Sequence, residues 1–337
     1  MISGSIVTYK RMVLVDSFVN VVFLFSILSI RCQCLFMNKR LLTLCSVLIT
    51  FCLADTKTNA QASVDIQLKT QLDAVYMQWR AAMIKKNYNL WAQYTATHRQ
   101  VHIKNRIVSE KKPFPTWIFQ VPASPPALAG LKPLSVSAKG ATATAVYFGK
   151  IDFGVGGNPT ENILLLDFIN ERGRWKYDKA EFIRLTDLKD VRIKIKEGDF
   201  SYIQQKDFQP SGVVPQMPIA VHTAKYIAKV YAFCPGREVK MKVNKISDHR
   251  FQDTKTSEVV VGGGVDGLNE VQFATKSLEG STGKEALCIR VYLMSTVKGV
   301  PPIKVFEYLV REEGAVKQFG SANFLIDLKV ATKLNKK

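Results

Sequence analysis

Two of the chain's four histidines lie four positions apart, in the stretch TATHRQVHIKNR. On a helix this spacing places His98 and His102 on one face, where both can bind zinc. Two ligands do not complete a zinc site, and the residues between them lack the glutamate of an H-E-x-x-H motif. Arg99, Lys104 and Arg106 would also repel a cation. We therefore expect no metal site, and we expect these three basic side chains to face an anion.

A proton-transfer enzyme needs only one histidine or carboxylate inside an apolar pocket, where the loss of hydration adjusts the pKa of that group. The residues of this chain that fit the role are His98, Asp152, Asp167 and Asp178. The aromatic residues that fit the lining of such a pocket are Trp79, Tyr94, Tyr147, Phe168, Trp175 and Phe182. Because they recur at helical and strand spacing, they equally fit a closed core. We assign no catalytic residue.

The sequence lacks the motifs of serine hydrolases and glycosidases, and it matches a dinucleotide-binding motif only in part. No G-x-S-x-G sequence is present, and no carboxylate pair stands out as a glycosidase dyad. GGGVDG, at residues 262–267, matches the G-x-G-x-x-G pattern of a dinucleotide site. Such a site needs a helix after the loop, yet the following LNEVQFATKSL alternates as a strand. We predict a hairpin loop there, and we expect no cofactor.

The elements that position these residues change type along the chain. Apolar periodicity predicts a helix over residues 65–86, a second around residues 90–94, and a third from Thr97, as its N-cap, toward Ser109. Residues 121–139 are rich in Pro, Ala and Ser and indicate a loop. Three extended runs then predict an antiparallel meander, at residues 141–154, 162–170 and 173–185. This order predicts an α+β domain over residues 63–186, with the long helix on the concave side of the sheet.

Two segments of this region carry a resemblance to a known family. MQWRAAMIKKNYNLWAQYTA resembles the paired N-terminal helices of the nuclear transport factor 2 superfamily, and LLLDFINERGRWKYDKAEF resembles its closing hairpin. The resemblance implies a cone-shaped α+β fold with a pocket. The superfamily includes polyketide-cyclase-like enzymes, isomerases and binding modules without activity, so the resemblance predicts fold better than function. It also implies a homodimer paired through the outer face of the sheet.

The second half of the chain is predicted to be all-β. Residues 187–218 contain a short helix, around residues 188–198, and then a linker rich in Pro and Gly. From residue 219 to residue 337, six strand-like segments are separated by turn residues. This pattern predicts a β-sandwich domain of immunoglobulin-like architecture.

The N-terminal segment predicts export. Residues 37–62, MNKRLLTLCSVLITFCLADTKTNAQA, have a basic start, an apolar run and the small-x-small pattern of a cleavage site. We predict a signal peptide cleaved near Ala62, which sends the chain to the periplasm or outside the cell. Residues 1–36 carry a second apolar run before Met37, and we interpret them as a mis-annotated extension. If they are retained, the two apolar runs would anchor the protein in a membrane.

Removal of residues 1–62 leaves 41 basic residues and 26 acidic residues, so the mature chain stays strongly basic. Long-range attraction then favours an anionic partner, such as an anionic surface, a polysaccharide or an acidic protein. Export and the lack of a run of like charges disfavour nucleic acid. Only Cys234 and Cys288 remain, and a pair in an oxidising compartment predicts one disulfide, with two buried free thiols as the alternative.

These observations predict an exported, non-catalytic binding or interaction module whose basic surface meets an anionic partner. The first alternative is a small lyase-like or isomerase-like enzyme that uses one proton-transfer residue in the pocket of the first domain. The second is a structural component of the cell envelope.

Overall fold

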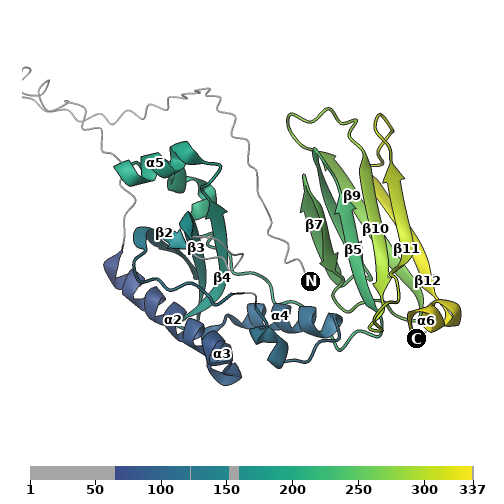
Figure 1. Ribbon diagram of the computed structural model, residues 1–337, viewed down its shortest axis with the longest axis horizontal. Coiled ribbons are helices and arrows are strands. Elements are labelled where there is room, and N and C mark those ends of the chain that lie inside the picture. The colour runs from purple at the N-terminus through teal and green to yellow at the C-terminus, as the bar shows by residue number, and fades with distance from the viewer. Residues whose placement is uncertain (1–64, 122, 152–158, 336–337) are drawn as a thin grey trace, which may run out of the picture. The chain divides into compact units, whose positions relative to one another are not determined.

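The computed structural model describes residues 65–121, 123–151 and 159–335 (Figure 1). The predictions made for residues 1–62 and for Asp152 lie outside this part of the chain. Residues 62–337 form one compact unit, so the predicted division into two domains stays a prediction. Within the described ranges, no helix is both long enough and apolar enough to cross a membrane.

Three helices open the described chain where the sequence predicts them. They are α2 (Ile66–Ile84), α3 (Tyr88–Tyr94) and α4 (Thr97–Ser109). The side chains of Asp65 and Asn87 cap α2 and α3, because each accepts a hydrogen bond from a backbone N–H of the first turn, at 2.9 Å and 3.0 Å. Two of the three helix starts are therefore fixed by local residues.

The N-terminus of α4 is held instead by a side chain from the sheet. The predicted N-cap, Thr97, is wrong by one position, because Ala96 occupies the cap and Thr97 is the first helical residue. The backbone N–H and the hydroxyl of Thr97 each donate to the Glu171 carboxylate, at 2.7 Å. Burial alone would raise the pKa of Glu171, but the hydrogen bonds from Thr97 and the ion pair with Lys176 lower it. An ionised carboxylate at this helix end also interacts favourably with the helix dipole.

A four-stranded antiparallel sheet follows, in the order β1-β2-β3-β4. Its strands are β1 (Lys132–Lys139), β2 (Thr142–Ile151), β3 (Thr160–Glu171) and β4 (Arg174–Arg184). The meander predicted for β2, β3 and β4 is confirmed. The loop predicted for residues 121–139 is wrong over β1, because Leu134 and Val136 are buried between the small and polar residues that suggested a loop.

Each face of this sheet is covered by other elements of the same region (Figure 1). On one face, α2 packs through Leu72 and Tyr76. On the other, α5 (Lys189–Glu197) and the turns after it supply Ile195, Ile203 and Phe208. The predicted short helix is thus confirmed, and it packs on the sheet. The linker predicted after it stays a prediction. The homodimer through the outer face stays a prediction, and residues of α5 already occupy part of that face.

One irregularity decides how β4 presents its side chains. Tyr177 and Lys179 pair with adjacent residues of β3, which leaves Asp178 between them as the extra residue of a β-bulge. Strict alternation would place Ala180 on the same face as Asp178. Because of the bulge, Ala180 instead joins Tyr177 in the core under α2.

The second half of the chain forms a two-layer β-sandwich with one shared core. One sheet has the order β11-β10-β5-β8 and the other has the order β12-β9-β6-β7. The strands are β5 (Ile227–Phe233), β6 (Arg237–Val243), β7 (Ser247–Gln252), β8 (Lys255–Val259), β9 (Gly267–Ser277), β10 (Leu287–Met294), β11 (Ile303–Val310) and β12 (Phe319–Ile326), and helix α6 (Leu328–Asn335) follows. The sequence predicted six of these strands and missed β7 and β12, whose segments SDHRFQ and FGSANFLI are rich in polar or small residues.

The loop GGGVDG connects the two sheets, and the predicted hairpin is wrong. It joins β8 in one sheet to β9 in the other, and no helix follows it. The amide N–H of Gly262 donates to Ser109 Oγ at 2.8 Å. Gly263 has a φ of +66°, and a Cβ atom there would lie 2.2 Å from the carbonyl oxygen of Tyr226. The glycines therefore serve close backbone packing and not phosphate binding.

The predicted disulfide between Cys234 and Cys288 is wrong, since both thiols are free and buried. Cys288 on β10 pairs with Phe233 on β5, and cross-strand partners share a face of the sheet. Cys234 follows Phe233 and therefore points to the opposite face, where it lies in the sandwich core. Burial raises the pKa of both thiols.

We expect a chain that starts at Ser63 to contain two free thiols. The two side chains lie on opposite faces of one sheet and cannot bond without breaking strand pairing. Thiol titration of the unfolded, unreduced protein should give two reactive groups per chain. A count of zero, in a preparation that was never reduced, would contradict the arrangement of β5 and β10.

Candidate functional site

The structure brings together two of the predicted proton-transfer residues. Asp178 in the bulge of β4 and His98 in the first turn of α4 are both buried, at 4% and 6% exposure. Asp178 Oδ1 lies 2.9 Å from His98 Nε2 and accepts a hydrogen bond from Arg99 Nε, also at 2.9 Å. The His98 contact lacks the geometry of a hydrogen bond, so Arg99 is the better-directed partner of the carboxylate.

This ionic cluster of His98, Arg99 and Asp178 is an internal contact. Arg99 turns toward Asp178, so the prediction that Arg99 faces an external anion is wrong. Lys104 and Arg106 lie on the exposed side of α4, and the Lys104 ammonium lies 5.6 Å from the centre of the Phe114 ring. None of the three cluster residues lines either of the two pockets described in the structure.

The aromatic residues predicted to line a pocket mostly fill the core instead. Trp79, Tyr147, Phe168 and Trp175 lie in the core between α2 and the sheet, Tyr94 is half-buried, and Phe182 is 43% exposed. The Tyr147 hydroxyl donates to the carboxylate of Asp73, and the Tyr76 hydroxyl donates to the carbonyl oxygen of Pro126 at 2.9 Å. Burial raises the pKa of both phenols well above its usual range. The two phenol hydroxyls of this interior are thus bonded to other protein groups, whereas the indole N–H of Trp79 is buried without a hydrogen-bond partner.

Asp167 lies on the opposite face of the sheet from this core. Its neighbours Leu166 and Phe168 point toward α2, and Asp167 accepts a hydrogen bond from the Thr144 hydroxyl at 2.8 Å. Burial raises the pKa of Asp167, although the hydrogen bond from Thr144 and the ion pair with Lys179 act in the other direction. This residue therefore cannot supply a base to the core between α2 and the sheet.

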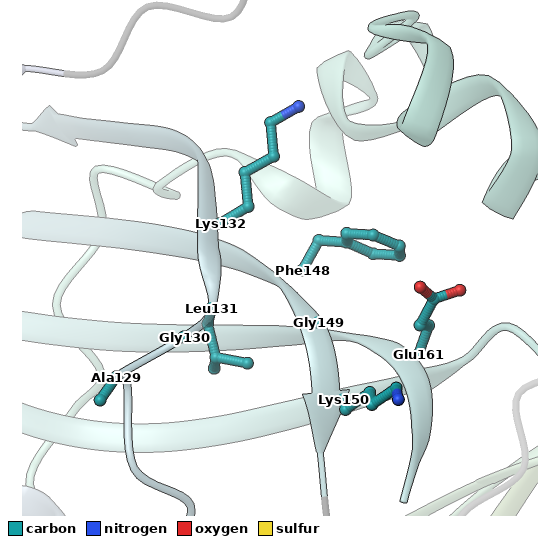
Figure 2. Close-up of a pocket in the computed structure, with 8 residues that line it drawn as sticks. All are labelled: Ala129, Gly130, Leu131, Lys132, Phe148, Gly149, Lys150 and Glu161. Carbon is teal, nitrogen blue, oxygen red and sulfur yellow. The ribbon is translucent and has the colours of Figure 1, made fainter.

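The larger of the two described pockets lies where β1, β2 and β3 meet the loop before β1, and its volume is about 470 Å³ (Figure 2). Its lining residues are Ala129, Gly130, Leu131, Lys132, Phe148, Gly149, Lys150 and Glu161. Lys132 pairs with Phe148 across the strands, and Lys150 pairs with Glu161, so these four side chains share the α5 face of the sheet. The volume falls in the range of small-molecule sites, roughly 300–1,000 Å³.

The charge of this pocket, here called the lysine pocket, is positive. Lys132 and Lys150 stand on either side of the Phe148 ring (Figure 2), and both are exposed. The Lys132 ammonium lies 5.1 Å from the centre of the Phe200 ring. The single lining carboxylate belongs to Glu161. Its Oε2 atom forms an ion pair with Lys196 Nζ at 2.8 Å, which neutralises its charge. The sequence did not indicate this site, because the two lysines lie 18 positions apart and line one pocket only through the pairing of β1, β2 and β3.

A second arrangement missed in the sequence has the connectivity of a hydrolase triad. His249 on β7 contacts Ser247 Oγ through Nε2 at 2.8 Å and the Glu258 carboxylate of β8 through Nδ1 at 2.8 Å. However, Ser247 is fully buried, and its Oγ also accepts a hydrogen bond from the backbone N–H of Val261 at 2.8 Å. A substrate carbonyl cannot reach this oxygen, so the group links the adjoining edges of the two sheets and does not act as a nucleophile.

We expect the Ser247→Ala variant to lose about 2 kcal/mol of unfolding free energy, because the buried His249 ring and the Val261 N–H lose a partner. Urea denaturation measures this loss, and Ser257→Ala, at an exposed position of β8, should change it by less than about 0.5 kcal/mol. A fluorophosphonate reagent should leave the folded wild-type protein unlabelled. Stoichiometric labelling of Ser247 would overturn the structural role given to it.

Among the described residues, no group of three or more His, Cys, Asp or Glu side chains could hold a metal ion. Comparisons with family models, with curated proteins and with solved structures each found no match.

Proposed function

We propose that the protein is an exported, non-catalytic binding module whose lysine pocket holds an anionic group. The observation that carries the proposal is that Lys132, Lys150 and Phe148 line one pocket, whose only lining carboxylate is already paired with Lys196. Two ammonium groups attract an anion, and the aromatic floor suits an apolar portion of the same ligand. The pocket contains no histidine that would serve as a general base.

We also propose a fold family for each half of the chain and an exported location for the protein. The helices packed on a curved antiparallel sheet support the cone fold of the nuclear transport factor 2 superfamily for the first region. The two-layer sandwich supports an immunoglobulin-like architecture for the second. Export rests on the signal-peptide pattern of residues 37–62, and the mass of the mature protein tests it.

A small lyase-like or isomerase-like enzyme is the second candidate, and the buried contact between His98 and Asp178 is the observation in its favour. An enzyme of this kind needs its base to touch an open pocket. The same carboxylate is bound by Arg99, and neither described pocket reaches it. The geometry therefore supports binding better than proton transfer. A structural envelope component would bind no specific ligand, and the experiment below distinguishes it.

The test is calorimetric titration of the chain from Ser63 with phenyl phosphate, with phenol as the uncharged control ligand. We expect phenyl phosphate to bind more tightly than phenol, and to bind more weakly as the salt concentration rises. The double variant Lys132→Ala with Lys150→Ala should weaken binding at least about tenfold, since each removed cation costs of order 1 kcal/mol. The matched control, Lys240→Ala with Lys276→Ala, removes two exposed lysines of the sandwich and should change nothing. Equal losses in both double variants would refute a specific pocket.

A further inference from the structure

The sandwich has one sheet face on which aromatic and basic side chains gather. The sheet β11-β10-β5-β8 turns Val230, Ala232, Ile289 and Val291 into the shared core. The alternate residues point the other way, and the strand register places them in rows. We call these outward-facing residues the aromatic face: Lys229, Tyr231, Phe233, Lys255, Ser257, Cys288, Arg290, Tyr292, Lys304, Glu307 and Leu309.

Three aromatic rings occupy the middle of this face. Tyr231 and Phe233 are alternate residues of β5, so their side chains lie about 7 Å apart along one strand. Tyr292 stands on the neighbouring strand β10, diagonal to Tyr231, because Arg290 is the direct partner of Tyr231. The Arg290 guanidinium lies 6.0 Å from the centre of the Tyr231 ring. All three rings are half-buried and keep part of their surface open to solvent.

The charges around these rings are mostly positive. Lys229, Lys255, Arg290 and Lys304 share the face with one carboxylate, Glu307. Glu307 forms ion pairs with Arg290 at 2.5 Å and with Lys304 at 2.6 Å. Lys229 lies 3.7 Å from Glu110 at the end of α4. Lys255 forms no ion pair within the described residues.

The outer face of the other sheet, β12-β9-β6-β7, differs in its charge and in its aromatic content, and it serves as an internal comparison. Its charges alternate and neutralise one another across strands, as in the ion pairs of Lys242 with Asp248 at 3.2 Å and of Arg250 with Glu238 at 2.6 Å. Its one large aromatic residue is Phe319, at the start of the edge strand β12 and 75% exposed. The aromatic and basic character therefore belongs to one face and is not a general property of the sandwich.

We propose that the aromatic face binds an acidic polysaccharide. Sugar rings present C–H groups that pack on the electron-rich faces of aromatic rings, which the Tyr231, Phe233 and Tyr292 side chains supply. Uronate carboxylates pair with the surrounding lysines, and sugar hydroxyls donate to Glu307. Single-stranded nucleic acid also stacks on aromatic rings, but its closely spaced phosphates favour an uninterrupted basic groove. The polymer class follows from the exported location in the proposed function, whereas the binding face is independent of the lysine pocket.

The experiment is affinity electrophoresis of the chain from Ser63 in gels that contain polygalacturonate, with neutral dextran gels as the reference. We expect retardation by polygalacturonate and little by dextran. The variant Tyr231→Ala with Tyr292→Ala should raise the apparent dissociation constant at least about tenfold, and Lys255→Glu, at an exposed position that no core packing depends on, should raise it about threefold or more. The matched control, Phe319→Ala, removes an exposed aromatic residue of the other sheet and should leave retardation unchanged.

Three results would overturn the proposal. The first is no retardation of the wild-type chain, and the second is retardation of the tyrosine and Lys255 variants equal to that of the wild-type chain. The third is tighter binding of an oligothymidylate than of polygalacturonate. Circular dichroism of each variant separates loss of binding from loss of folding. Binding of phenyl phosphate in the lysine pocket should be the same in all these variants. A failure of the aromatic face is thereby distinguished from a failure of the proposed function.

Discussion

Replacement of Asp178 by alanine is expected to lower the free energy of unfolding by about 3–5 kcal/mol. The carboxylate is buried and bonded to Arg99, which is only partly exposed, and its removal leaves the Arg99 charge without a partner. The nearby His98 ring would lose its closest polar contact as well. Urea denaturation followed by circular dichroism measures the change.

The matched control for this variant is Glu181→Ala, three residues along the same strand. Glu181 pairs with Lys179, but its side chain is 52% exposed, so its loss should change stability by no more than about 1 kcal/mol. Similar costs for the two variants would show that Asp178 is not the buried anchor between β4 and α4. It would then be free for another role, which would revive the enzyme alternative.

The Gly263→Ala variant is expected to be the second most harmful substitution, at about 4 kcal/mol. A Cβ atom at this position would lie 2.2 Å from the Tyr226 carbonyl oxygen and 2.6 Å from the Ala224 Cβ atom, so the backbone must move. Such overpacking costs about 1–3 kcal/mol, and the left-handed φ adds about 1–2 kcal/mol.

Gly267 offers a control within the same motif. It also has a positive φ, of +78°, but nothing lies within 4 Å of the position a Cβ atom would take. The Gly267→Ala variant should therefore cost only the backbone strain, about 1–2 kcal/mol. If the two glycine variants were equally stable, close packing of the GGGVDG loop against the chain before β5 would be refuted as the reason for its glycines.

Much of the fold could be predicted because local patterns determined it. The apolar spacing of residues 65–86 and the caps at Asp65 and Asn87 follow from nearest neighbours along the chain. Strands that are rich in apolar residues, such as β3 and β10, were equally recognisable. β1, β7 and β12 were missed or misread because their polar and small residues are buried or paired only by tertiary packing.

The candidate sites depended on registers that no sequence window contains. The bulge at Asp178 turned a predicted proton-transfer residue into an ion-pair partner of α4. The alternation of β5 and β10 separated the two cysteines, although both strands were predicted correctly and Cys234 directly follows β5 while Cys288 lies in β10. Lys132 and Lys150 line one pocket because β1 pairs with β2, and β1 itself was predicted as a loop. Long-range pairing therefore decided each site that the sequence misplaced.

The most direct test of the account is to locate bound anion on the folded chain. Isotope-labelled protein from Ser63 onward would be titrated with phenyl phosphate and followed through its backbone amide resonances. We expect the largest shifts at residues 129–132 and 148–150, which line the lysine pocket, and none at His98 or Asp178. Shifts centred on His98 and Asp178, with the lysine pocket unaffected, would contradict the account and favour a proton-transfer site.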